Sequence, residues 1–180
     1  MLFLAISGSL RSASTNSVVV RSLAALTPGG AQTTVYEGLN DLPHFNPDLD
    51  GPQVAEAVLA FRAALQQCSA VLISSPEYAH GVPGVLKNAL DWVVSSGELA
   101  GKPVALFNTS PRATHAQASL IEILTTMGAE VLPAASPTLP IAGRGLTETA
   151  IGSDAALAEP LRAALALVYQ RTQATAAATS

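Results

Sequence analysis

The stretch LFLAISGSLRSASTNSVVVRSLAAL (2–26) joins an apolar run to a helical pattern through a short polar loop. The run at 2–7 is too short for a helix and shows no polar alternation, which is typical of a parallel strand buried on both faces. Apolar residues in 16–26 recur at helical spacing. The segment therefore predicts a strand, a loop and a helix whose first backbone N–H groups face that loop.

The rest of the chain repeats this alternation. Further short apolar or β-branched runs lie at 32–37, 70–75, 103–109 and, more weakly, 129–133. Helical patterns lie at 53–68, 84–96, 113–128 and 154–172. Right-handed crossovers place a helix between neighbouring parallel strands, so the pattern predicts a parallel sheet covered on both faces. We expect an α/β fold, a three-layer α/β/α sandwich with a five-stranded parallel sheet.

The length and the 49% hydrophobic content allow a single domain with a large core. We assign residues 1–172 to that domain and 173–180 to a flexible tail. In the last helix Asp154 is a candidate N-cap, and Pro160 is a candidate kink or restart. The Pro- and Gly-rich segment 132–148 predicts a long loop.

Composition excludes several classes of partner. A net charge of −4 with no basic stripe argues against nucleic acid. The start lacks the basic leader of an export signal, and no apolar stretch approaches the roughly 20 residues that cross a bilayer. We expect a cytoplasmic protein without a membrane partner. Cys68 is the only cysteine, so the chain forms no internal disulfide and no multi-cysteine metal site.

The first loop, SGSLRSASTN (7–16), has the chemistry of an anion site. Ligands of a doubly wound sheet bind at the loops that follow the carboxyl ends of its strands. Hydroxyl and amide side chains here can donate hydrogen bonds, and Arg11 adds a guanidinium that matches phosphate oxygens. Neither G-x-G-x-x-G nor G-K-[ST] is present, so one terminal phosphate fits better than a triphosphate with magnesium. In the alternative, Ser14 or Thr15 only caps the helix and Arg11 extends into solvent.

The second loop lies within SSPEYAHGVPGVLKNALDWV (74–93). Pro76 ends the strand, and Gly81 with Pro83 predicts a compact turn before the helix. Such a turn presents backbone groups to a flat ligand, with the ring or hydroxyl of Tyr78 beside it. Taken alone, this stretch predicts only a turn.

These loops resemble those of the NADPH-dependent FMN reductases, a family of flavodoxin-like fold that includes quinone and chromate reductases. The resemblance rests on GSLRSASTN (8–16), SPEYAHGVPGVLKNALDW (75–92) and, less tightly, LPHFNPDLD (42–50). The chain departs from the family pattern at two places. Ala79 stands where asparagine is common, and Arg112, Thr114 and His115 occupy a segment that is glycine-rich in many relatives.

The resemblance implies an FMN whose phosphate lies at the first loop and whose ring lies at the second. The implied cofactor-binding residues are Ser9, Arg11, Ser14, Thr15, Asn16, Pro76, Glu77, Tyr78, Ala79, Gly81 and Ser110. No catalytic side chain and no metal are implied, because the flavin performs the chemistry. For Arg112 three roles stay open: positive potential beside the flavin, contact with a phosphate of NADPH, and plain exposure to solvent. His80 and His115 lie in these loops and stay outside the catalytic set.

The implied function is that of an enzyme, an NAD(P)H-dependent reductase. A hydride would pass from NADPH or NADH through flavin N5 to FMN, a quinone or another small acceptor, and one site used in turn predicts ping-pong kinetics. An alternative is a flavodoxin-like FMN electron carrier without NAD(P)H oxidation, although its charge is mild for a carrier. A phosphate-ligand sensor or a nucleotide-processing enzyme could share the sheet alone. The apolar helix with Trp92, together with the resemblance, predicts a homodimer or homotetramer.

Overall fold

The computed structural model describes residues 1–178. Its sheet has five strands in the order β2-β1-β3-β4-β5, all paired in parallel. The strands are β1 (Leu2–Ser7), β2 (Gln32–Tyr36), β3 (Ala70–Ser74), β4 (Pro103–Leu106) and β5 (Glu130–Val131). This is the strand order of flavodoxin-like sheets, with its reversal between β1 and β3. The predicted strands are all present, and the last ones are shorter than their sequence patterns.

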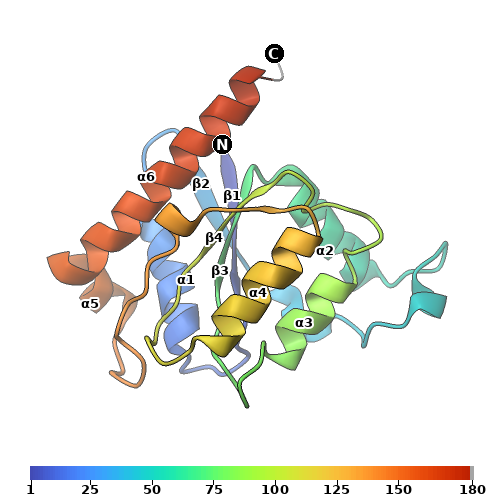
Figure 1. The fold of residues 1–180 in the computed structure, drawn as a ribbon, viewed down its shortest axis with the longest axis horizontal. Coiled ribbons are helices and arrows are strands. Elements are labelled where there is room, and N and C mark those ends of the chain that lie inside the picture. Colours follow the sequence, from blue (N-terminus) through green and yellow to red (C-terminus); the bar gives the residue numbers. More distant parts are fainter. Residues whose placement is uncertain (179–180) are drawn as a thin grey trace.

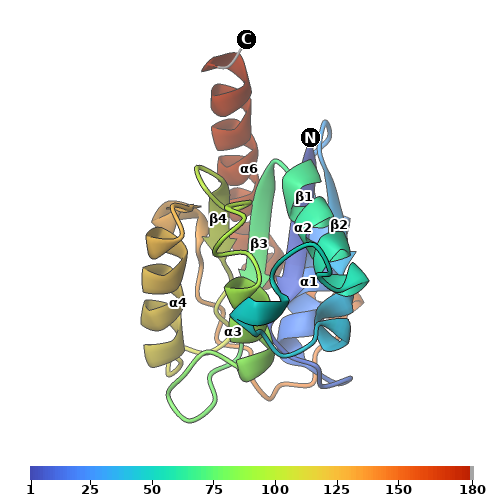
Figure 2. The ribbon, with the colours of Figure 1, turned by 90° about the vertical axis from the view of Figure 1, so that its right-hand side faces the viewer.

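Helices cover both faces of the sheet, as Figures 1 and 2 show. They are α1 (Thr15–Leu26), α2 (Glu56–Gln67), α3 (Gly84–Asp91), α4 (His115–Thr126), α5 (Glu148–Ser153) and α6 (Ala155–Ala178). Short 3₁₀ segments span Gly38–Asp41, Pro47–Leu49 and Pro133–Ala135. The first, fifth and sixth helices pack on one core, and the second, third and fourth on the other. This confirms the predicted three-layer sandwich.

Alternation along β1 divides its side chains between the two cores. Leu4 and Ile6 join the core under α2, α3 and α4, whereas Phe3 and Ala5 join the core under α1 and α6. Successive side chains of a strand point to opposite faces, so an unbroken apolar run is what a doubly covered strand requires. No helix within 1–178 combines the length and apolarity needed to span a membrane.

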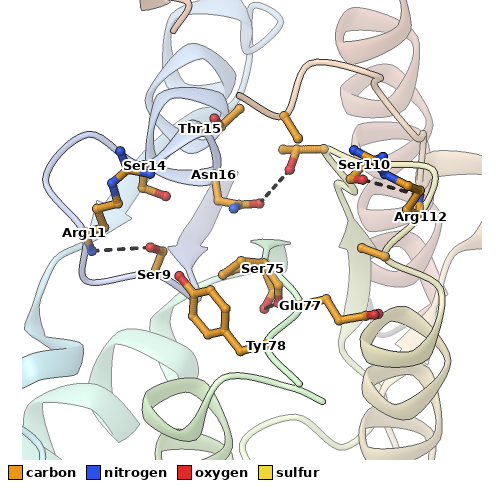
Figure 3. Close-up of a pocket in the computed structure, with 14 residues that line it drawn as sticks. Ser9, Arg11, Ser14, Thr15, Asn16, Ser75, Glu77, Tyr78, Ser110 and Arg112 are labelled. Carbon is orange, nitrogen blue, oxygen red and sulfur yellow. Dashed lines mark hydrogen bonds between the residues drawn. The ribbon is translucent and has the colours of Figure 1, made fainter. Parts of the chain in front are cut away.

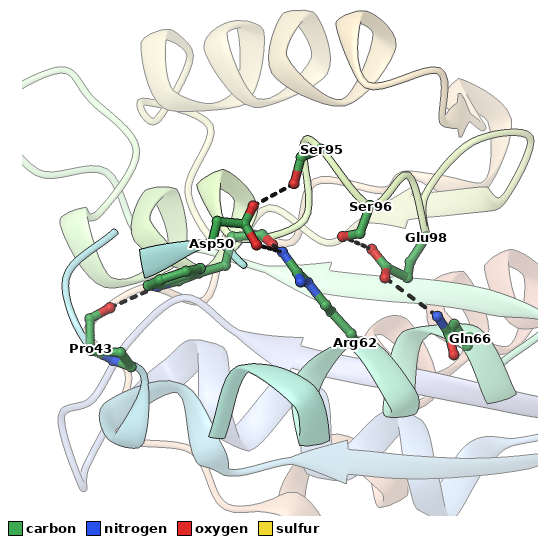
Figure 4. A network of polar contacts seen from close by, with 8 residues as sticks. Pro43, Asp50, Arg62, Gln66, Ser95, Ser96 and Glu98 are labelled. Atoms are coloured by element: carbon green, nitrogen blue, oxygen red, sulfur yellow. Dashed lines mark hydrogen bonds and ion pairs between the residues drawn. The ribbon is translucent and has the colours of Figure 1, made fainter. Parts of the chain in front are cut away.

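The helix predicted over 84–96 ends at Asp91, because Trp92 has tertiary partners. The Trp92 side chain is fully buried, and its Nε1 donates to the Pro43 carbonyl at 2.8 Å. The Trp92 carbonyl accepts a hydrogen bond from Arg62 Nε at 3.0 Å (Figure 4). Trp92 therefore belongs to the core and not to an exposed apolar face, so it no longer supports a subunit interface.

Helix α6 is longer than its sequence pattern. Asp154 Oδ1 accepts the Ala156 N–H at 3.0 Å, which confirms the predicted N-cap. Pro160 lies inside the helix without interrupting it, and α6 continues through Ala178. The segment 173–178, which was assigned to a flexible tail from the sequence, is helical, and 179–180 lie outside the described residues. Alanine has the highest helix propensity, and the last described segment is rich in it.

Candidate functional site

A cavity of about 360 Å³ opens at the carboxyl edge of the sheet, where strands β1, β3 and β4 end. The loops 8–14, 75–83 and 107–114, which lead into α1, α3 and α4, supply most of its wall (Figure 3). The lining residues are Ser9, Arg11, Ser14, Thr15, Asn16, Ser75, Pro76, Glu77, Tyr78, Thr109, Ser110, Arg112, Ala113 and Ala142. The cavity lies at the point of strand-order reversal, where ligands of such sheets bind.

The first loop is held close to β3. Gly8 N donates to the Ser74 carbonyl at 2.8 Å, and a Cβ at Gly8 would lie 2.6 Å from Ser75 Oγ, so only glycine fits. Ser14 is the N-cap of α1 and its Oγ accepts the Ser17 N–H at 3.4 Å. Ser14 also lines the cavity. From the sequence, helix capping and ligand binding were alternatives for Ser14. The structure shows that one side chain can both cap α1 and line the cavity.

Asn16 offers donors to the cavity from a buried position. Asn16 is 5% exposed. The side-chain Oδ1 accepts hydrogen bonds from Ser74 Oγ at 2.9 Å and Thr109 Oγ1 at 3.4 Å. Within residues 1–178 its Nδ2 has no hydrogen-bond partner. Ser74 Oγ shares its one proton between Asn16 Oδ1 and the Phe107 carbonyl, which lies 2.8 Å away. With the amide oxygen facing the two hydroxyls, the Asn16 N–H groups remain for a ligand.

Two guanidinium groups flank the cavity. Arg11 and Arg112 lie on opposite sides of it, with Asn16 and Ser75 between them (Figure 3). Neither guanidinium has an ion-pair or hydrogen-bond partner in the described part of the chain. Both residues are exposed, so each cation is available to an anion that enters from solvent.

The second loop is a tight two-residue turn. Tyr78 N donates to Gly81 O at 3.2 Å, and Gly81 N donates to Tyr78 O at 2.9 Å. Between them Ala79 and His80 have φ values of +48° and +58°, in the left-handed region. Such turns favour Asn and Gly, which gives the departure at Ala79 a backbone cost. Ala79 and Gly81 shape the turn but do not line the cavity, unlike the other predicted cofactor-binding residues.

Contacts to α4 fix this turn. Glu77 Oε2 accepts the Ala116 N–H at 2.8 Å, in the first turn of α4. The His80 and His115 rings stack, with their centroids 4.3 Å apart and their planes 10° apart. Glu77 therefore both lines the cavity and serves as a carboxylate at the start of α4.

Some of the cavity wall was not predicted from the sequence. Ser75 directly follows β3, and Thr109 lies three residues beyond the end of β4. The rule that ligands bind after strand ends could have identified both. Ala142 comes from the loop before α5, and its N–H donates to the Thr109 carbonyl at 3.0 Å. No motif marks Ala142. Among the described residues no cluster of His, Cys, Asp and Glu could hold a metal ion.

Comparison with known proteins gives consistent matches. The family model described as NADPH-dependent FMN reductase matches residues 1–143. A NADH:(hydroxy)cinnamate reductase subunit of Vibrio ruber is 35% identical over 139 residues, which is 74% of this chain and 68% of that protein. An NAD(P)H-dependent FMN reductase of Pseudomonas aeruginosa is 37% identical over 109 residues, which is 59% of this chain and 58% of that protein. A quinone reductase of Pseudomonas putida is 40% identical over 111 residues, with the same two coverages.

A solved structure extends the likeness over the whole fold. FerB, a flavoenzyme NAD(P)H:(acceptor) oxidoreductase from Paracoccus denitrificans, superimposes with a TM-score of 0.79 at 29% identity, covering 96% of this chain and 97% of FerB. By contrast, the chain spans only 58% of the length of the Pseudomonas FMN reductase and quinone reductase in the sequence matches. The fold likeness is therefore broader than the sequence likeness.

Proposed function

This chain belongs to the NADPH-dependent FMN reductase family, and from that premise we propose that it transfers reducing equivalents from NAD(P)H to FMN, a quinone or another small acceptor. Family membership confirms the predicted class of protein, an oxidoreductase that uses FMN and NAD(P)H. The observation that carries the proposal is the buried Asn16 amide, whose free N–H groups face the cavity beside Arg11.

The phosphate of FMN fits the end of the cavity next to α1. Ser9, Arg11, Ser14, Thr15 and Asn16 would hold it. The start of α1 adds unpaired backbone N–H groups and the positive end of the helix dipole, which together favour an anion. The neutral donors orient the phosphate, and Arg11 supplies the countercharge.

The flavin ring fits the part of the cavity lined by Pro76, Glu77, Tyr78 and Ser110. Bound FMN would supply the redox chemistry, and the protein would supply placement. The bond from Ala116 N to Glu77 holds the loop in position without a ligand. Tyr78 is 56% exposed, and among residues 1–178 it is the only aromatic residue in the cavity wall, so one side stays accessible from solvent. An open side supports alternate use by donor and acceptor, the order expected for ping-pong kinetics.

Two measurements on the purified protein test the proposal. FMN is titrated by flavin fluorescence quenching, and NADPH or NADH oxidation is followed with a quinone as acceptor. We expect saturable FMN binding and quinone-dependent turnover with parallel double-reciprocal plots. Absence of FMN binding would contradict the proposal. Binding without NAD(P)H oxidation would support the electron-carrier alternative instead.

The Asn16→Asp variant tests the observation that carries the proposal. A carboxylate can still accept from Ser74 and Thr109, so the loop keeps its contacts, but the donor end becomes an oxygen that repels phosphate. FMN affinity should fall by about tenfold or more. The matched control is Asn46→Asp, because Asn46 Oδ1 only accepts the Asp48 N–H in an exposed turn and aspartate can do the same. Equal FMN affinity in both variants would remove the support that Asn16 gives.

Assembly and location are further parts of the proposal. We expect a homodimer or homotetramer that works in the cytoplasm, as the sequence resemblance implies. Light scattering on the purified protein and cell fractionation test the two points separately. A monomer at micromolar concentration would contradict the proposed homodimer or homotetramer.

A further inference from the structure

Most cationic side chains of the described residues have a partner within the chain. The ion pairs are Arg21–Glu148, Arg62–Asp50, Lys87–Asp91, Arg162–Glu159 and Arg171–Glu130. Lys102 Nζ donates to the Cys68 carbonyl. Over residues 1–178, only Arg11, Arg112 and Arg144 have guanidinium groups without a hydrogen-bond or ion-pair partner. All three lie in loops around the cavity, so the unpaired positive charge gathers at one edge of the molecule.

Of these cations, Arg11 is the one next to the end of the cavity where the FMN phosphate fits. Arg11 stands in the loop before α1. Arg112 lies across the cavity from it (Figure 3). Arg144 follows Ala142, which lines the same cavity as Arg112. The Arg112 side is therefore available to a second anion.

The loops that carry Arg112 and Arg144 have fixed backbones, whereas the two guanidinium groups are exposed to solvent. Arg112 N donates to Ser110 Oγ at 3.3 Å. The Thr109 carbonyl, in the loop after β4, accepts N–H bonds from Ile141 and Ala142, at 3.1 and 3.0 Å. The Arg112 and Arg144 loops are thus tied to each other at Thr109. Both arginines are exposed.

Exposure decides between two anions that Arg112 could meet. Water and salt screen an exposed guanidinium from a charge inside the cavity, so it would do little for a reduced flavin ring. The same group can bind a phosphate entering from solvent by two parallel hydrogen bonds. A phosphate monoester carries nearly two negative charges near neutral pH, whereas each phosphate of a pyrophosphate diester carries one. Two cations from loops that meet at Thr109 match the monoester better.

We propose that Arg112, assisted by Arg144, binds the 2′-phosphate of NADPH and gives the protein a preference for NADPH over NADH. The inference rests on the proposed function, since it assigns a coenzyme contact at the same cavity. It adds a specificity-determining residue in the segment where the chain departs from the family pattern. Arg11 and Arg112 would then serve different phosphates, one of the flavin and one of the donor.

Calorimetric titration of adenosine 2′,5′-bisphosphate and of AMP tests the contact without turnover. The proteins are FMN-loaded wild type, Arg112→Met and Arg162→Met, a matched control whose arginine pairs with Glu159 on α6. Arg112→Met should weaken bisphosphate binding by about tenfold and AMP binding by less than about twofold, because only the charged contact to the 2′-phosphate is lost. Arg112→Lys should recover part of the loss, and Arg162→Met should match wild type.

Steady-state kinetics give a second readout. The ratio of the KM for NADPH to the KM for NADH should rise about tenfold in Arg112→Met. Equal weakening of bisphosphate and AMP would overturn the proposal in favour of a contact to the 5′-phosphate. A changed flavin midpoint potential with unchanged bisphosphate affinity would overturn it in favour of a contact to the flavin. No change in any readout would overturn it as well.

Failure of the proposed function gives a different result. A wild-type protein that does not bind FMN, or that oxidises neither coenzyme, contradicts the reductase proposal whatever Arg112 does. The bisphosphate titration is then repeated on the flavin-free protein, where wild type and Arg112→Met are compared in the same way. Binding that depends on Arg112 would retain the phosphate site, and equal binding would overturn it.

Discussion

Arg62 and Arg11 carry the same guanidinium group in opposite environments. Arg62 is 14% exposed at its side chain; it donates to the Trp92 carbonyl at 3.0 Å and to Asp50 Oδ1 at 2.9 Å (Figure 4). Arg11 is exposed at the cavity and has no partner within residues 1–178. A buried cation without partners would be costly, so the fold supplies them for Arg62. An exposed cation has no such requirement and can await a ligand.

The largest expected effect is the loss of stability when Arg62, the arginine with partners in the fold, is replaced. Arg62→Met removes the cation and leaves the Asp50 carboxylate, whose side chain is only 13% exposed, without its ion pair. The free energy of unfolding, measured by urea titration, should fall by about 3 kcal/mol. In the control Arg162→Met, an exposed pair is lost and the change should stay below about 0.5 kcal/mol. Similar losses in both variants would mean that burial does not distinguish the two arginines.

Arg11→Ala tests the ligand-binding side. Loss of a charge-assisted contact should weaken FMN binding by roughly 1.5–3 kcal/mol. The unfolding free energy of the flavin-free protein should change by less than about 0.5 kcal/mol, because Arg11 has no partner there. Fluorescence titration and urea unfolding on the same preparation check both numbers. A variant that unfolds more easily but binds FMN normally would reverse the roles assigned to Arg11 and Arg62.

Acid pH should weaken the Arg62 network. The hydrogen bond from Ser95 and the one from Arg62 lower the pKa of the Asp50 carboxyl from its ordinary value of 3.8. A folded-state pKa below the unfolded one contributes stability that is complete above the unfolded pKa and is lost as the pH falls through the folded pKa. The difference in unfolding free energy between wild type and Asp50→Asn should therefore shrink below about pH 4. A difference that stays constant with pH would contradict this linkage.

The smallest expected effect is at the Tyr78–Gly81 turn. Ala79 has a φ of +48°, which costs an alanine but not a glycine. Ala79→Gly should raise the unfolding free energy by about 0.5–1 kcal/mol. The matched control Ala60→Gly, at an exposed position inside α2, should lower it by a similar amount. If both variants changed the unfolding free energy in the same direction, the backbone at Ala79 would not be strained.

Much of the site could be predicted because its signals are local. The β1 run, the hydroxyl-rich loop and the start of α1 are contiguous, so Ser9, Arg11 and Asn16 were predicted to face one anion site. The rule that ligands bind after strand ends brought Tyr78 to the same edge of the sheet, and the family resemblance added Ser110. The structure brings these residues together at one cavity.

Other features depend on contacts between distant segments. The bond from Ala116 to Glu77, the stacking of His80 on His115 and the arrival of Ala142 at the cavity join parts of the chain that no motif connects. The early end of α3 has the same origin, because the Trp92 carbonyl bonds to Arg62 of α2.

The amino-acid sequence alone determined the alternation of strands and helices, the polar loops at one edge of the sheet and the resemblance to FMN reductases. Apolar periodicity and turn residues act over a few neighbouring positions, so these features can be predicted from the order of residues along the chain. Only the tertiary structure decided which arginines are neutralised and which face the cavity unpaired. An ion pair depends on the distance between side chains far apart in the sequence, and folding alone sets that distance.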